Sequence, residues 1–421
     1  MTVPRTPSSQ KPLSSEPVTP RAEKAVTLCI VSAKYPYGQG EAFLDTELRA
    51  LAPGFANVVL FPTSPTASTL GYRDVPAEVV RIPLAGPATL LLAARAALRN
   101  PRRALGAIAT LLRERYPVRA KVKNLAVIPK GLALAELART RRIGHLHAYW
   151  LSTPATVAWL AARVAGIPFS ATTHRWDLYE NNMASRKLRD ARFIRTISER
   201  GREDLLRMTS GDPAKAIVIR LGIALPAAGP ARVRATGPLR ILCAARLVPV
   251  KGHSVLIEAL SRLRADGVAF ACTLAGEGEL RDAIARHIVE AGLQGAVVLA
   301  GVVPHDDLLA QLRAGEYDVS VIASIERPGG LMEGVPVVLI EAMAAGVVAI
   351  ATDSGSVREL IDGQTGLLVP ESDAGALAAA LARVSADPVL RDRLRDAGRA
   401  RVEQEFNGAR TADRLRSLLT V

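Results

Sequence analysis

The sequence is poor in aromatic residues and has no apolar run long enough to cross a bilayer. Phe, Trp and Tyr make up 4% of the 421 residues, whereas hydrophobic residues as a whole make up 49%. This composition relies on Ala, Leu and Val, and it is typical of helix-rich α/β proteins rather than of all-β or disordered ones. The apolar stretch at residues 83–94 is soon followed by arginines and is shorter than the roughly 20 residues of a membrane helix. We therefore expect no membrane span.

Cysteine occurs only three times, at Cys29, Cys243 and Cys272, each within a short apolar segment. None has a Cys or His at the spacing of a metal site, which indicates buried free thiols. An odd and sparse set of cysteines suits a reducing compartment. Residues 1–24 are polar, predict a disordered tail and lack the apolar core of a signal peptide. These features together predict a cytoplasmic protein.

Acidic residues are outnumbered, since 54 Lys and Arg face 40 Asp and Glu and give a formal net charge of +14. Such a charge predicts an anionic partner, which could be nucleic acid, anionic lipid or a phosphate-bearing substrate. The excess is greatest over residues 95–130, where ten basic residues accompany the single acid Glu114. Leu, Ala and Ile between them make the stretch amphipathic. We expect it to dock reversibly on an anionic membrane, and a solvated helix face is the equally weighted alternative.

The alternation of predicted strands and helices indicates two domains, because a chain of 421 residues exceeds the size of one core. We expect a Rossmann-like domain over residues 25–224, a Pro- and Gly-containing linker over 225–238 and a second Rossmann-like domain over 239–395. One long helix from about residue 390 to 419 is predicted, and its end, within residues 396–421, should pack back on the first domain. Strands are predicted over residues 25–32, 58–61, 145–148, 169–172, 239–244, 270–274, 296–300, 319–323 and 348–351.

Open parallel sheets bind ligands beyond the carboxyl ends of their strands, so the site should lie between the two domains. Arg246 and Lys251 directly follow the strand predicted over residues 239–244. Cations there could stabilise the negative charge on a departing nucleotide diphosphate, although solvated surface cations would give the same pattern. Gly276 and Gly278 lie between a strand and a helix, where glycines let amides approach a bound group or merely allow a tight turn.

The strongest signal is a pair of carboxylates, Glu333 and Glu341, on either side of a Gly-Val-Pro turn. Gly334 and Pro336 preclude a continuous helix, so Glu333 should lie on a loop and Glu341 in the helix that Pro336 opens. The start of that helix favours a phosphate group. Glu341 could then accept hydrogen bonds from ribose hydroxyls, and Glu333 from the transferred sugar. A helix-start acid and a surface residue are the alternative, but apolar neighbours of Glu341 argue against a solvated face.

The second half resembles the retaining family 4 glycosyltransferases of the GT-B fold. Two glutamates separated by seven residues, matched by Glu333 and Glu341, are the hallmark of that family, and its Arg and Lys-Gly are matched by Arg246, Lys251 and Gly252. The resemblance implies an α/β protein with two doubly wound domains that face a cleft. It implies donor binding by Gly252, Gly276, Gly278, Gly334, Val335, Pro336, Val337 and Glu341.

The first half is similar to the exopolysaccharide branch of that family, including colanic-acid-type enzymes. The resemblance is carried by Glu41-Ala-Phe-Leu, by His145-Leu-His147 and by Thr173-His174-Arg-Trp-Asp177. The His of the family reaches the donor sugar, which implies a catalytic set of His174, Arg246, Lys251 and Glu333. A structural histidine is the alternative for His174. A candidate acceptor or donor loop comprises Gly38, Gly40, Glu41 and Asp177. The sequence departs from the family at Ala224, where Asp is usual, at Ser356, where Gly is usual, and in an insertion at residues 327–330.

These features predict an α-retaining transferase acting on a lipid-linked or oligosaccharide acceptor in exopolysaccharide or cell-envelope assembly. A nucleotide-diphosphate sugar is the expected co-substrate. No cofactor or metal is expected, because Arg246 and Lys251 can neutralise the diphosphate and no Asp-x-Asp motif lies nearby. A GT-B epimerase or phosphorylase would share the cleft but need donor-only chemistry or a lysine-bound cofactor. A basic nucleic-acid-binding protein is the alternative from another class, but the basic stretch lacks the series of aromatics that base stacking needs.

Overall fold

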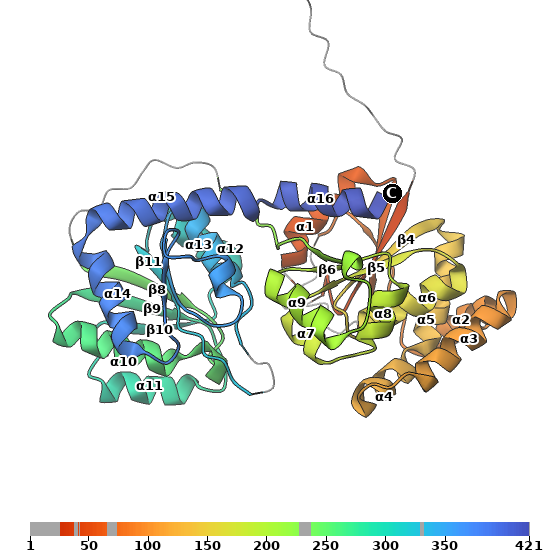
Figure 1. Cartoon of the computed structure of the whole chain (residues 1–421), viewed down its shortest axis with the longest axis horizontal. Coiled ribbons are helices and arrows are strands. Elements are labelled where there is room, and N and C mark those ends of the chain that lie inside the picture. The colour runs from red at the N-terminus through yellow and green to blue at the C-terminus, as the bar shows by residue number, and fades with distance from the viewer. Residues whose placement is uncertain are drawn as a thin grey trace, which may run out of the picture.

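The computed structural model forms two α/β domains side by side (Figure 1). The predicted tail at residues 1–24, Gly38, Gly40 and most of the predicted linker lie outside the residues that the structure describes. Among the described helices, none is both long and apolar enough to cross a membrane. The described residues are 26–37, 41, 43–64, 74–226, 237–328 and 332–420.

The first domain is built on a seven-stranded parallel sheet in the order β3-β2-β1-β4-β5-β6-β7. The strand order reverses between β1 and β4, which is the switch point where ligands of such sheets bind. The sequence predicted β1, β2, β4 and β5, whereas β6 and β7 have three residues each and are too short to show a periodic pattern. The strands are β1 Thr27–Ser32, β2 Asn57–Pro62, β3 Glu78–Val79, β4 Ile143–Tyr149, β5 Phe169–Thr173, β6 Ile194–Thr196 and β7 Ala216–Val218.

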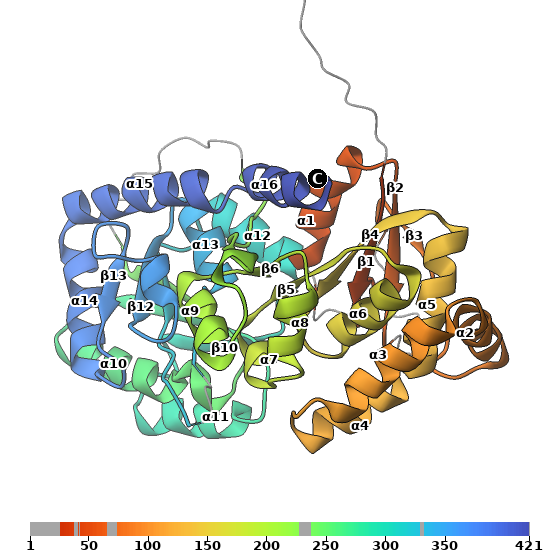
Figure 2. The ribbon, with the colours of Figure 1, turned by 45° about the vertical axis from the view of Figure 1, so that its right-hand side comes forward.

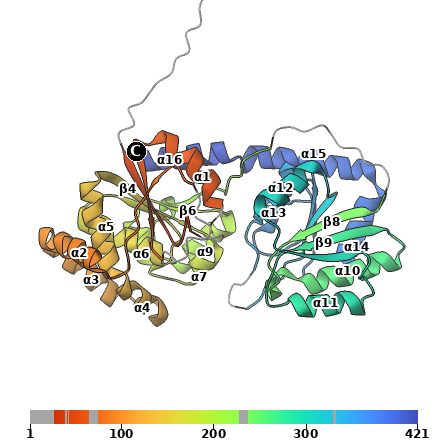
Figure 3. The same cartoon turned by 180° about the vertical axis from the view of Figure 1, so that it is seen from behind.

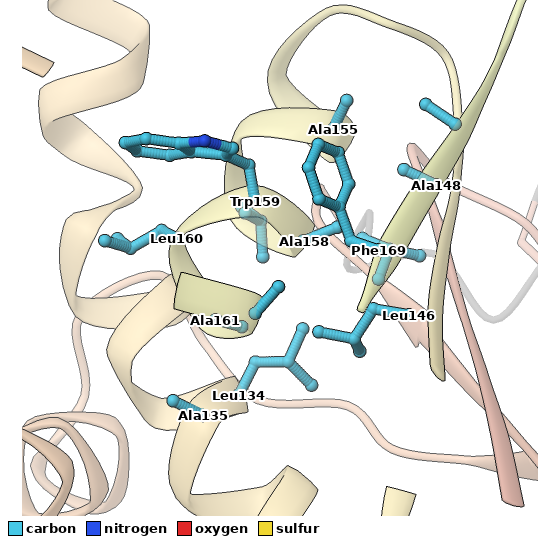
Figure 4. Close-up of a cluster of buried hydrophobic side chains, with 14 of the residues drawn as sticks. Leu134, Ala135, Leu146, Ala148, Ala155, Ala158, Trp159, Leu160, Ala161 and Phe169 are labelled. Atoms are coloured by element: carbon cyan, nitrogen blue, oxygen red, sulfur yellow. The ribbon is translucent and has the colours of Figure 1, made fainter. Parts of the chain in front are cut away.

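The strands of this sheet carry apolar side chains on both faces, and helices cover each face. Along β1, Cys29 and Val31 enter one apolar cluster, while Leu28 and Ile30 enter another, as the two-residue period of a strand requires. Figure 4 shows the first cluster, where Trp159 lies among side chains from neighbouring elements. The helices are α1 Phe43–Leu51, α2 Pro87–Arg99, α3 Pro101–Arg113, α4 Val118–Ala126, α5 Ile128–Thr140, α6 Thr153–Ala165, α7 Arg175–Tyr179, α8 Ala184–Asp190 and α9 Glu199–Met208.

The second domain has a six-stranded parallel sheet in the order β10-β9-β8-β11-β12-β13, with its switch point between β8 and β11. Cys243 and Cys272 are buried free thiols in its core, and Cys29 is one in the first domain, as predicted. The strands are β8 Leu239–Ala244, β9 Phe270–Ala275, β10 Val297–Gly301, β11 Val319–Ile322, β12 Val348–Thr352 and β13 Leu367–Val369. The helices are α10 His253–Ala265, α11 Arg281–Glu290, α12 His305–Ala314, α13 Val337–Ala344 and α14 Ala374–Ala386.

The end of the chain differs from the single long helix that the sequence predicted. It forms two helices, α15 Pro388–Glu405 and α16 Gly408–Thr420. At the break, the amide of Ile223 donates to the Phe406 carbonyl and the Gly408 amide donates to the Ile223 carbonyl, both at 2.9 Å. These bonds satisfy backbone groups that a continuous helix would have paired internally. The helix α15 lies on the second domain and α16 on the first (Figure 3), where Leu415 is buried against α1.

Candidate functional site

The loop after β8 places two predicted cations at the switch point of the second sheet. Arg246 is exposed and forms no ion pair with another described residue. Lys251 precedes Gly252, the residue just before α10, and its Nζ lies 2.6 Å from Oε2 of Glu333. The Ser324 hydroxyl donates to the same carboxylate oxygen at 2.6 Å. The fold therefore brings Lys251 and Glu333 together although 82 residues separate them.

Gly276 and Gly278 serve the shape of this loop. Gly276 has φ +148°, and a Cβ there would overlap the Ala245 carbonyl oxygen. A Cβ at Gly278 would overlap the carbonyl of Leu247. The Gly276 amide donates to the Gly301 carbonyl at 2.7 Å, so it is not free to bind a phosphate. The structure thus corrects the expected amide contact at Gly276, since both glycines let this turn pack against the Arg246 loop.

The predicted turn at Glu333 leads directly into α13. Glu333 lies on the loop and Glu341 in the helix, as predicted. Pro336 precedes the helix, and Val337 provides its first amide, which has no acceptor within the helix. Apart from its two chain neighbours, no described residue has a heavy atom within 4 Å of a Cβ added to Gly334. Among the described residues, space is therefore open near the start of α13, where free amides and the helix dipole favour an anionic group.

Glu341 has a partner that the sequence did not reveal. Its Oε1 lies 2.7 Å from Nε2 of His305, the first residue of α12. Glu341 is buried, while the His305 side chain is half exposed. Both residues line a cavity of about 350 Å³ between α12, α13 and the segment at residues 221–226, a volume typical of ligand pockets. In the sequence, the only local feature that could have drawn attention to His305 is its position after Pro304 at the start of a helix.

His174 reaches the same region from the first domain. It lies at the end of β5, and burial, with a smaller effect of Arg195, lowers its pKa to about 3. The ring is therefore neutral near pH 7. Its centroid lies 4.2 Å from that of Trp150. His174 lines a small cavity of about 20 Å³ together with Gly334 and Val335 of the second domain, so the structure brings it to the Glu333 loop.

Two arginines that the sequence analysis did not single out connect the domains at this point. Arg175 Nη1 donates to the Glu333 carbonyl at 2.8 Å, and Arg200 Nη1 donates to the Gly355 carbonyl at 3.0 Å. Gly355 has φ +60°, and a Cβ there would overlap the Glu333 carbonyl oxygen. The backbone of Glu333 is thus held from both domains. The position of Arg175 directly after His174 was its only signal.

The carboxylates of Glu41 and Asp177, expected in a ligand loop, hold backbone groups instead. Glu41 accepts hydrogen bonds from the amides of Lys34 and Tyr35, both at 2.6 Å. Asp177 accepts from the amides of Leu151 and His174 at 2.6 and 2.8 Å, and burial raises its pKa to about 7. Both carboxylates therefore shape the loops at the carboxyl edge of the first sheet, next to His174.

The chemistry available at this site is electrostatic. Arg246 and Lys251 lie on the loop after β8, and the start of α13 lies beside Glu333. Together they can bind a diphosphate and stabilise charge that develops on it. Among the described residues, no group of three His, Cys, Asp or Glu side chains could hold a metal ion.

Known proteins resemble both the sequence and the fold. The family model of the glycosyl transferases group 1 matches residues 230–401. The putative colanic acid biosynthesis glycosyltransferase WcaL of Salmonella typhimurium is 37% identical over 210 residues, which are 49% of this chain and 51% of the relative. The chain thus matches about half of that relative. The glycogen synthase of Mycobacterium tuberculosis is 30% identical over 301 residues, which are 67% of this chain and 70% of the relative.

The fold extends over nearly the whole chain. The crystal structure of HepE from Anabaena in complex with UDP superposes with a TM-score of 0.68 at 17% identity, covering 94% of this chain and 99% of that one. At that identity the likeness concerns the fold alone. The two-domain α/β architecture is the GT-B fold, as the sequence predicted.

Proposed function

Because this chain belongs to the group 1 glycosyl transferases, we propose that it moves a sugar from a nucleoside-diphosphate sugar to a lipid-linked or oligosaccharide acceptor. The observation that carries this proposal is the cluster formed by Lys251, Glu333 and the start of α13. Glu341 follows in the second turn of that helix. The UDP complex of a protein with the same fold supports the donor class. The colanic acid relative supports an acceptor in exopolysaccharide or cell-envelope assembly.

In this proposal the donor diphosphate lies at the start of α13, in the open space beside Gly334. Lys251 and Arg246 neutralise its charge, so the diphosphate needs no metal ion. Glu341 accepts hydrogen bonds from the ribose hydroxyls and exchanges part of its contact with His305. The buried carboxylate of Glu341 is held for this role, because carboxylates accept hydrogen bonds only and cannot compete as donors.

Transfer is driven by stabilisation of the leaving diphosphate. Negative charge grows on it as the glycosidic bond to the sugar breaks, and cations fixed by the fold stabilise that charge most in the transition state. Glu333 contacts hydroxyls of the sugar, and neutral His174 contributes a hydrogen bond without adding charge. Retention of configuration without a covalent enzyme intermediate belongs to the proposal through the resemblance to the retaining family 4 enzymes.

Arg175 has a positioning role in this mechanism. Its contact with the Glu333 carbonyl reaches across from the first domain, so the sugar-binding loop is placed only when the two domains are together. Glu41 and Asp177 position the facing loops through backbone amides. The reaction belongs in the cytoplasm in this proposal, since three free buried thiols and no disulfide among the described cysteines suit a reducing compartment.

The test is a panel of UDP-, GDP- and ADP-sugars measured by thermal stabilisation and then by turnover. A ligand that binds only the folded state raises Tm, so one nucleotide class should raise it well above the others. The chosen donor should then lose its sugar only when an acceptor is added. Failure of every nucleotide sugar to shift Tm would refute the donor class, and conversion of the donor without acceptor would point to an epimerase.

A further inference from the structure

Large hydrophobic side chains exposed to solvent are concentrated on the helices at the outer end of the first domain. Of fourteen such side chains in the described chain, nine lie between residues 84 and 125. Scattered exposed apolar residues are ordinary, but a concentration on consecutive helices marks an interaction surface. Figure 2 shows α2, α3 and α4 on the side of the first domain away from the second. The nine are Leu84, Leu90, Leu91, Leu98, Leu105, Leu112, Val118, Val122 and Leu125.

On α3 the exposed apolar and basic residues share one face. At 3.6 residues per turn, Arg102, Leu105, Leu112 and Arg113 fall within about 100° of the helix circumference. Leu105 is 67% exposed and Leu112 is 51% exposed. The opposite face is the buried one and carries Ala104, Ala107 and Leu111. The helix therefore has its core face occupied and a second apolar face without a covering element among the described residues.

On α4 the pattern is sharper. Val118, Val122 and Leu125 form an exposed apolar stripe, with Arg119 on one flank and Lys121 on the other. The buried side of this helix is fixed to the domain by polar contacts. Asn124 Nδ2 donates to Asn182 at 2.7 Å, and the Thr156 hydroxyl donates to Asn124 at 3.0 Å. The apolar stripe thus points outward because the helix is anchored that way round.

The structure also separates the cations of this stretch by their surroundings. Arg99 lies 3.4 Å from Glu136, and Lys123 lies 3.7 Å from Glu180. Lys130, counted with the amphipathic stretch from the sequence, is fully buried and donates to the Thr63 carbonyl at 2.9 Å. Lys130 is therefore not available to a surface partner, and Arg99 and Lys123 share their charge with an acid. Arg102, Arg113, Arg115 and Arg119 are exposed and form no ion pair with another described residue.

A cavity adjoins the end of α3 and could receive an anionic group. It measures about 610 Å³ and lies between α3 and the start of α8, with Arg113, Arg115 and Arg186 in its lining. Arg186 forms ion pairs with Asp190 at 2.8 Å and with Glu114 at 3.6 Å. The charge of Arg113 and Arg115 is unshared in the described chain, so positive charge lies directly beside the apolar face of α3.

We propose that α3 and α4 form a docking surface for a bilayer that contains anionic lipid. Leu105, Leu112 and Val118 enter the boundary between headgroups and acyl chains, and Arg102 and Arg113 bind lipid phosphates. Helices with an apolar stripe flanked by Lys and Arg lie in the membrane interface in this way. Docking does not depend on sugar transfer, but it would place the first domain against the leaflet that holds a lipid-linked acceptor.

The experiment is liposome flotation of the full chain with three matched proteins. One vesicle set is phosphatidylcholine alone and the other contains phosphatidylglycerol as well. The docking variant combines Arg102→Gln, Arg113→Gln and Arg119→Gln. The control variant combines Arg286→Gln, Arg383→Gln and Arg393→Gln, three exposed arginines of the second domain, and it has the same net charge as the docking variant.

Wild-type protein should float with anionic vesicles only, and less so as salt rises. The docking variant should lose roughly 100-fold in partition coefficient, since each basic residue near an anionic surface contributes severalfold. The control variant should stay near wild type. An equal loss in both variants would show that net charge, and not this surface, attracts the vesicles, and equal flotation with neutral vesicles would also overturn the proposal.

A second variant tests the apolar residues of the docking surface. It also tests whether a second copy of the chain, rather than a membrane, binds there. Leu105→Gln, Val118→Gln and Val122→Gln together change exposed side chains, so folding should be unaffected. Flotation that persists at high salt in wild type should disappear in this variant. If ultracentrifugation instead shows a wild-type dimer that the variant abolishes, the surface joins two copies and the proposal falls. Lys251→Ala should float like wild type, which separates a failure of docking from a failure of the proposed transfer.

Discussion

Replacing Glu341 with Ala is expected to weaken the binding of nucleoside diphosphates. The carboxylate is buried in α13 and already lies 2.7 Å from His305 Nε2, so it is oriented before the donor arrives. A hydrogen bond to a charged group contributes about 1.5–3 kcal/mol. Its loss should raise Kd roughly 10- to 150-fold. The His305 side chain is half exposed, so water can replace Glu341 as its hydrogen-bond partner. We therefore expect the variant to remain folded.

The sharpest assay compares each nucleotide with its 2′-deoxy form by titration calorimetry. Wild type should prefer the ribose form, and the Glu341→Ala variant should bind both forms with similar Kd, because the discriminating carboxylate is gone. Glu290→Ala is the matched control, since Glu290 is an exposed acid of the same domain and carries the same charge. A Glu341→Ala protein that keeps the full preference for ribose would refute the assignment of Glu341.

Three further outcomes are expected. Lys251→Ala should lower kcat/KM roughly 10²–10³-fold, as for a lost transition-state contact, with little change in Tm because Ser324 still donates to Glu333; a parallel loss of Tm would make the lysine structural. Turnover should survive excess EDTA, and loss that Mg²⁺ or Mn²⁺ restores would mean that Arg246 and Lys251 do not suffice for the diphosphate. His253 is buried, and its pKa is lowered to about 4, mainly by burial and then by Lys251. Between pH 6.5 and 4 its ring is therefore protonated in the unfolded chain but not in the native one, so stability is lost as the pH falls through that range. In urea unfolding, His253→Leu should therefore reduce the difference in unfolding free energy between pH 7 and 4.5 by about 2 kcal/mol, and an unchanged difference would contradict the neutral buried ring.

The sequence by itself determined many of the local units of the second domain. The strand β8 has the predicted bounds, and β9 differs from its prediction by one residue, because runs of apolar residues are a local property of the chain. Gly334 and Pro336 likewise decided that Glu333 lies on a loop and Glu341 in a helix. These features depend on residues a few positions apart, so they can be recognised along the chain.

Only the tertiary structure decided which of these residues meet. The contacts of Arg175 with Glu333 and of His305 with Glu341 span 158 and 36 residues, and they follow from the strand order and from the meeting of two domains. The same holds for Lys130, which the amphipathic pattern placed at the surface, whereas the fold buries it and its ammonium donates to the carbonyl of Thr63, just after β2. Local periodicity specifies a face of a helix, whereas the partner of that face depends on long-range packing that no short segment encodes.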